Sequence, residues 1–178
     1  MTRFSPRFRL FLATLVAPLV VGGCSVAGAG EGNAANEPPV TIRSGGWLIE
    51  GSKAFAHSPT MSHEKACVEE GNRSQFIPIV VTGLLREDMA IAQLTCTGPT
   101  LGRTGNLVNG QMSCSNSDRG TFIVKARGVI SAEKIAVDYD FDLSKTRLTA
   151  AERAKAEEEI RTNPPSLTAR RIGSCAAI

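Results

Sequence analysis

The sequence predicts a mainly β fold: a single curved antiparallel sheet, arranged as a meander or an incomplete barrel, with one helical insertion near residues 149–161. Three observations lead to this prediction. Residues 96–114 carry a cysteine at each end and turn-forming glycines in the middle, as in a hairpin closed by a disulfide. Residues 135–143 alternate between apolar and acidic side chains, which is typical of a strand with one packed face. The segment after Thr149 is rich in strong helix formers.

The first 23 residues have the pattern of a secretory signal peptide. Three arginines precede an apolar run of about 12 residues, and small residues follow it. Such a run is shorter than the roughly 20 residues that a helix needs to span a bilayer. The sequence Val21-Gly22-Gly23-Cys24 resembles a bacterial lipobox, in which the cysteine becomes the acylated first residue. We therefore expect lipidation at Cys24, which also accounts for the odd number of five cysteines.

The residue after Cys24 is Ser25, where an aspartate would resemble an inner-membrane retention signal. We therefore expect a lipoprotein of the cell envelope, held in the outer membrane by its acyl chains and facing the periplasm. Residues 24–44 would be the lipidated cysteine and a flexible tether, since they are rich in Gly, Ala, Asn and Pro. Residues 45–178 would be a disulfide-stapled β domain.

The charge balance argues against some classes of partner. The chain has 20 basic and 17 acidic residues, and the leader holds three arginines and no acidic residue, so 17 of each remain after cleavage. A neutral domain lacks the basic stripe of a nucleic-acid-binding surface. We expect no nucleic-acid partner, and we expect acyl chains rather than surface charge to anchor the protein.

The globular part begins with a strand through Trp47, the one tryptophan of the chain, which we expect in the core. The next segment, residues 57–67, is ambiguous. Ser62 has the chemistry of a helix N-cap, and the same residues are equally compatible with a strand that ends at Cys67.

An apolar run at residues 76–81 contains Pro78, which confines it to a sheet edge, a strand start or a bulge. Residues 84–89 then make a short polar connection to the hairpin. Two further strands follow the hairpin, at residues 121–126 and 135–143. Tight turns separate them, so the four strands form a meander.

The hairpin has a defined register if its two cysteines face each other. With Cys96 opposite Cys114, the midpoint falls on Gly105, and Gly102 lies opposite Val108. Tight turns favour glycine because it adopts positive φ without strain. The sequence therefore predicts the first turn of the meander at Gly105.

The predicted helix begins with Thr149 and Glu152, which have the spacing of a capping box. It runs through Arg161 and ends before the sequence Asn163-Pro164-Pro165. Its apolar side consists mainly of alanines, so we expect it to pack lightly as an insertion between two strands. Residues 167–175 form the last strand.

Three aspartates, Asp138, Asp140 and Asp142, share the polar face of the strand 135–143. A calcium-binding loop of this type needs a glutamate at its twelfth position, where the sequence has Thr149. Alternate residues of a strand also lie about 7 Å apart. We therefore expect no metal site here, and a solvated face that discourages pairing between sheet edges.

Four cysteines remain for the domain, and they allow three pairings. The hairpin argument joins Cys96 to Cys114 and leaves Cys67 for Cys175. None of the four belongs to a Cys-x-x-Cys pair, which argues against a zinc site and a redox centre. We therefore expect two structural disulfides.

Two other pairs of residues have side chains that bind ligands in many proteins. His57 and His63 lack a second pair at metal-ligand spacing, so we expect surface histidines. Arg170 and Arg171 would suit an anion. In a strand, however, neighbouring side chains point to opposite faces, so we expect a structural role.

The start Gly45-Gly46-Trp47, the four ordered cysteines and the ending Ala169-Arg170-Arg171-Ile172-Gly173-Ser174-Cys175 resemble the domain of unknown function 3617 family of exported bacterial proteins. The ending is most similar to the family's Gly-Arg-Arg-Ile-Gly-Asp-Cys, and it differs at Ala169 and Ser174. The resemblance implies an exported, mostly β domain. It implies no catalytic residues and no established activity.

Two hypotheses of function follow from these observations. The sequence has no Gly-x-Ser-x-Gly, His-Glu-x-x-His or phosphate-binding glycine loop, so we predict no enzyme and no cofactor. The first hypothesis is a non-catalytic envelope lipoprotein that acts as a structural or interaction module. The second is a periplasmic binding module whose curved sheet encloses a small apolar ligand or lipid. They differ in whether the apolar faces fill one another or leave a cavity.

Overall fold

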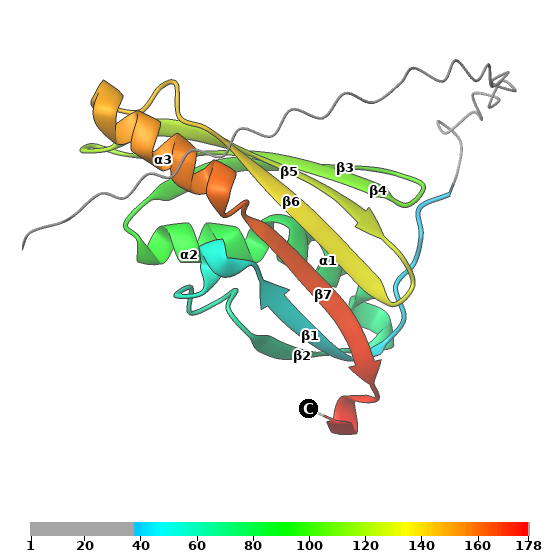
Figure 1. Ribbon diagram of the computed structural model, residues 1–178. Coiled ribbons are helices and arrows are strands. Elements are labelled where there is room, and N and C mark those ends of the chain that lie inside the picture. Colours follow the sequence, from blue (N-terminus) through cyan, green and yellow to red (C-terminus); the bar gives the residue numbers. More distant parts are fainter. Residues whose placement is uncertain (1–37, 178) are drawn as a thin grey trace, which may run out of the picture. The chain divides into compact units, whose positions relative to one another are not determined.

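The computed structural model describes residues 38–177. The predicted signal peptide, Cys24 and the tether up to residue 37 lie outside the described residues. Seven strands form one antiparallel sheet that curls into a half-barrel, and a helical segment lies against its inner face (Figure 1). The predicted mainly β fold with a single curved sheet is confirmed.

The sheet has the order β2-β1-β7-β6-β5-β4-β3. Its strands are β1 (Gly45–Gly51), β2 (Glu64–Val68), β3 (Thr95–Thr104), β4 (Leu107–Asn116), β5 (Gly120–Ile130), β6 (Lys134–Asp142) and β7 (Ser166–Gly173). The helices are α1 (Arg73–Pro78), a π-helical turn (Ile79–Gly83), α2 (Leu84–Ile91) and α3 (Ala150–Thr162). Of the ambiguous segment 57–67, residues 64–67 belong to β2, while residues 57–63 form turns and bends. The predicted helix after Thr149 is confirmed.

The meander consists of β3 to β6, as the alternation in the sequence predicts. On β6 the inward side chains Ile135, Val137 and Tyr139 are buried, while Asp138 and Asp140 are exposed. However, β6 lies between β5 and β7 and is not an edge strand. The role expected for the aspartates, to discourage pairing between edges, is therefore wrong.

These aspartates instead lie opposite basic residues of the neighbouring strand. Arg127 of β5 is the cross-strand partner of Asp138, and Lys125 is the partner of Asp140. Opposite charges at directly opposed positions stabilise a sheet by roughly 0.2–1 kcal/mol each. The solvated face thus favours the register of the meander.

The hairpin of β3 and β4 pairs Cys96 with Cys114, but its register changes beyond them. Gly98 and Pro99 form a bulge opposite Met112, and Gly98 has a positive φ of 62°. The extra residue shifts the pairing by one position, so Gly102 faces Asn109 and not Val108. The turn itself contains Gly105, with a φ of 55°.

The prediction that residues 76–81 form a sheet edge, a strand start or a bulge is wrong, and so is the predicted polar connection at residues 84–89. They form a continuous helical segment, residues 73–91, made of α1, the π turn and α2. Pro78 lies inside it, where the missing N–H removes one helical hydrogen bond, and the π turn follows directly. The buried side chains recur in helical pairs: Phe76 and Ile77, Val80 and Val81, Leu84 and Leu85.

The core lies between this helical segment and the inner face of the sheet. Trp47 has an exposed fraction of 0% and its ring lies 5.4 Å from that of Phe76, so its predicted core position is confirmed. Tyr139 forms an edge-to-face contact with Phe55 at 5.8 Å. Its hydroxyl donates to the Val80 carbonyl oxygen at 3.2 Å, within the π turn. That bond ties the sheet to the helix.

The two ends of the domain meet in the sheet, because β1 lies between β2 and β7. This arrangement brings Cys67 to Cys175, with a Cα–Cα distance of 5.1 Å. Cys96 and Cys114 are 4.0 Å apart by the same measure. Both pairs are at bonding distance, and they are the pairs that the sequence analysis selects.

The domain begins earlier than residue 45, because the last residues of the predicted tether lie against it. Ile42 has an exposed fraction of 1%, and three arginines of different elements bind alternate carbonyl oxygens around it. Arg103 donates to Val40, Arg73 to Ile42 and Arg171 to Ser44. The composition of residues 40–44 predicts a tether, because the residues that bind this segment are distant in the chain and leave no local pattern.

The two disulfides should differ in their contribution to stability. The loops that they close span 108 and 18 residues, and the chain-entropy model gives about 4.7 and 3 kcal/mol for loops of roughly 100 and 15 residues. Replacing Cys67 and Cys175 by alanine should therefore lower the free energy of unfolding more than replacing Cys96 and Cys114. Urea unfolding followed by Trp47 fluorescence measures the free energy of unfolding of both variants. A larger loss in the Cys96 and Cys114 variant would contradict the prediction that the longer loop contributes more.

Burial raises the pKa of Tyr139 above its ordinary value of about 10. The folded domain therefore keeps the neutral phenol, while the unfolded chain ionises above about pH 10. Stability should fall as the pH rises through that value, and Tyr139→Phe should show a smaller alkaline loss. The variant should also lose about 1 kcal/mol at neutral pH, because the Val80 carbonyl loses its donor. Urea midpoints near pH 7.5 and 10.5 test this, and parallel losses in both proteins would contradict it.

Candidate functional site

The residues singled out for ligand binding lie apart in the structure. His57 and His63 are exposed, and the Nδ1 atom of His63 lies 3.6 Å from a carboxylate oxygen of Glu50. Arg170 also reaches Glu50, at 3.3 Å, while Arg171 donates to the Ser44 carbonyl. The two arginines thus point to different sides of β7 and bind protein groups, as the structural role predicts.

Two properties of residues 38–177 bear on the class of site. Among them, no group of three or more His, Cys, Asp or Glu side chains is arranged to hold a metal ion. In this part of the chain, no helix combines the length and the apolarity that a membrane crossing requires. Several clefts lie on the surface of this part of the chain, and two of them are neighbours at one end of the half-barrel.

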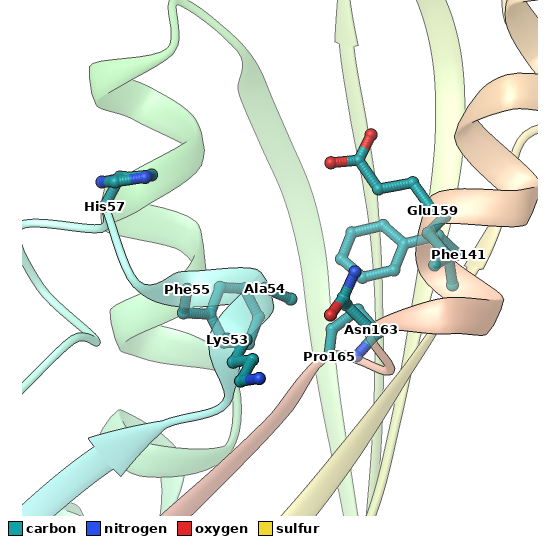
Figure 2. Close-up of a pocket in the computed structure, with 9 residues that line it drawn as sticks. Lys53, Ala54, Phe55, His57, Phe141, Glu159, Asn163 and Pro165 are labelled. Atoms are coloured by element: carbon teal, nitrogen blue, oxygen red, sulfur yellow. The ribbon is translucent and has the colours of Figure 1, made fainter. Parts of the chain in front are cut away.

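The two clefts lie on either side of Ile160 of helix α3. The first has a volume of about 420 Å³, and Figure 2 shows Lys53 and Phe55 on one wall with Phe141 and Glu159 on the other. The second has a volume of about 470 Å³, and Glu159 and Ile160 line both clefts. The second cleft is lined mainly by apolar side chains: Met89, Leu94, Phe122, Leu143, Leu148 and Ala156.

The clefts exist because helix α2 ends before the sheet does. Gln93 has a positive φ of 62°, and the Leu94 N–H bonds back to the Met89 carbonyl oxygen, which closes the helix. Phe141, the last inward side chain of β6, and Leu143, directly after the strand, are therefore only half-buried. They would be exposed to water without α3.

Helix α3 covers this surface incompletely. Its inward residues Ala156 and Ile160 are half-buried, and none of its residues is fully buried. Alanine is too short to reach the aromatic floor of the cleft, so space remains beneath the helix. The light packing predicted for this helix is confirmed, and the cleft is its direct consequence.

Hydrogen bonds hold α3 at its two ends rather than along its length. Thr149 and Glu152 form both bonds of the capping box, and these bonds lower the pKa of the Glu152 carboxyl. Arg153 donates to the Thr146 carbonyl oxygen. At the other end, the Ser52 hydroxyl donates to the Pro164 carbonyl oxygen at 3.0 Å. The helix is thus attached by its two connections.

The segment 40–44 meets the domain at the opposite end from α3 (Figure 1). Its Val40 N–H bonds to Gly105 in the β3–β4 turn, and Arg43 bonds to Ala132 in the β5–β6 turn. Helix α3 follows the other end of β6. With 11 residues in β5, the two ends are about 35 Å apart at ~3.3 Å per residue.

Sequence reasoning identified the helix but missed the clefts. The available signal was the combination of an alanine-rich helix with inward-facing Phe122, Phe141 and Leu143 on the strands. Comparison of the chain with models of known protein families, with curated proteins and with solved structures finds no match.

Loss of the capping box should loosen α3 without unfolding the domain. Replacing Thr149 by alanine removes the N-cap, at a cost of about 1 kcal/mol to the helix. Because α3 has no fully buried residue, the melting temperature should change little. Hydrogen exchange of residues 150–162 should become faster, while exchange in β5 stays constant. A large fall in melting temperature would show that α3 is integral to the core.

Proposed function

We propose that this protein is a non-catalytic lipoprotein of the bacterial cell envelope, acylated at Cys24 and facing the periplasm from the outer membrane. The observation that carries this proposal is the lipobox at residues 21–24 that follows an apolar leader. The fixing of Val40, Ile42 and Ser44 by three arginines supports it. Because the domain thus begins at Val40, the proposed link between the anchor and the domain consists of the residues from Cys24 to Pro39.

The cysteine pairs fit export to an oxidising compartment. All four cysteines of residues 38–177 are bonded in pairs, and disulfides persist in the periplasm but are rare in the cytosol. The sulfur atoms of the domain therefore serve its stability. This use of cysteine supports a structural or interaction module over a thiol enzyme.

We further propose that the chain belongs to the domain of unknown function 3617 family. The two halves of the motif on which this rests are neighbours in space, because Gly46 pairs with Gly173, and Trp47 with Arg171. A side chain at Gly45 would collide with the Gly173 carbonyl oxygen. The close approach of β1 and β7 thus explains why position 45 is a glycine, although its neighbour Gly173 is far away in the sequence.

Within the domain, the segment 40–44 and the clefts lie at opposite ends. Val40 and Arg43 bond at the end that carries Gly105 and Ala132, and α3 lies at the other end (Figure 1). Leu107 and Val129, which are cross-strand partners, lie near the end that carries Gly105, with exposed fractions of 52% and 48%. The α3 end is thus separated from the point where the link enters the domain.

Replacement of Cys24 by serine tests the anchor. In a bacterium with two membranes, the wild-type chain should incorporate an alkyne-labelled fatty acid and fractionate with the outer membrane. Cys24→Ser should abolish the label and the outer-membrane location, because the serine lacks the thiol that is acylated. Labelling by click chemistry and membrane fractionation measure both properties.

The matched control is Ser25→Asp, which keeps the acylated cysteine. It should retain the label and move the protein to the inner membrane. A wild-type chain without label, or a Cys24→Ser chain that keeps label and location, would contradict the proposal.

A further inference from the structure

We propose that the two clefts beside α3 form one binding site for a monoacyl phospholipid with a zwitterionic head group, and that α3 is the lid of this site. The acyl chain lies in the second cleft and the head group in the first. The inference goes beyond the proposed function, since it rests on the clefts alone and does not require the anchor at Cys24.

The second cleft has the properties of an acyl-chain site. Its volume of about 470 Å³ lies within the range of roughly 300–1,000 Å³ that is typical of ligand pockets. Its lining includes Phe122 of β5, Leu143 directly after β6 and Met89 of α2. Each methylene that leaves water for such a surface favours binding, because apolar area is removed from water.

The first cleft has the charges that a zwitterionic head group needs. Lys53 lines one wall and Glu159 the opposite wall (Figure 2), and both residues are exposed. An ammonium at Lys53 attracts the phosphate, while the Glu159 carboxylate attracts the amine of the lipid. Asn163 also lines this cleft and adds an amide that both donates and accepts hydrogen bonds.

The two clefts are neighbours that share two lining residues. Glu159 and Ile160 border each cleft, so a ligand that places its head near Glu159 directs its chain past Ile160. Phe141 is half-buried on the first side, and Leu143 is half-buried on the second. An acyl chain covers these side chains, which α3 leaves partly exposed.

Helix α3 has the attachment expected of a lid. It is 13 residues long and has no fully buried residue. Its hydrogen bonds to the rest of the domain lie at its ends, through Arg153 to Thr146 and through Pro164 to Ser52. Lifting its centre therefore opens the second cleft without breaking a buried contact of the core.

The test uses the full chain, purified from the cell fraction in which it is found, and a palmitoyl lysophosphatidylethanolamine with a diazirine in its acyl chain. Light-induced crosslinks should map to residues 156–160 of α3 and to Leu143, directly after β6. Ala156→Leu fills the second cleft and should lower the crosslinking yield at least about tenfold. The matched control Ala154→Leu makes the same change at an exposed position and should leave the yield unchanged.

Competition tests the head group. Unlabelled lysophosphatidylethanolamine should suppress the crosslinks, while palmitate at the same concentration should compete at least about tenfold less well. Lys53→Glu should remove this difference. Crosslinks spread evenly over the domain, equal yields in Ala156→Leu and Ala154→Leu, or equal competition by palmitate would overturn the proposal. Loss of Cys24 labelling in the anchor experiment would leave these results unchanged, so the two proposals fail separately.

Discussion

The pairing of β1 with β7 is the constraint on which the rest of the domain depends. It joins the first and the last strand of the domain inside a seven-stranded sheet and places Trp47 in the core. It also brings Cys67 to Cys175 and Arg171 to the carbonyl of Ser44. Such long-range contacts require a large loss of chain entropy before they form. A disulfide and a hydrogen-bonded N-terminal segment at the same place offset part of that loss.

A difference in length between the sheet and its covering helix explains the clefts. The segments α1, the π turn and α2 have 6, 5 and 8 residues, which span about 28 Å at ~1.5 Å per residue. The 11 residues of β5 extend to about 35 Å. The helix therefore leaves the end of the inner face uncovered, and α3 covers it with alanine and one isoleucine. Tyr139, bonded to Val80 in the π turn, fixes which part of the sheet is covered.

The sequence was most informative where structure depends on neighbouring residues. The alternation in β6, the capping box at Thr149 and the turn at Gly105 were all predictable, because each depends on a few adjacent positions. The helical segment 73–91 was not predicted, because Pro78 argued for a sheet edge and outweighed the helical spacing of the buried pairs. The bulge at Gly98 and the fixing of Ile42 depend on contacts between distant residues, and local patterns carry no information about those. The clefts beside α3 arise where an alanine-rich helix meets large apolar side chains of other elements, which the sequence shows only as separate patterns.

Native-state hydrogen exchange tests the central role of the β1–β7 pairing most directly. If that pairing organises the domain, the amides of Leu48 and Ile49 should exchange only through global unfolding, with the same opening free energy as the amides of β6. Exchange would be followed by NMR at several low urea concentrations. If the β1 amides opened several kcal/mol more easily than those of β6, the meander would be stable without the chain ends. That result would contradict the central role of the β1–β7 pairing.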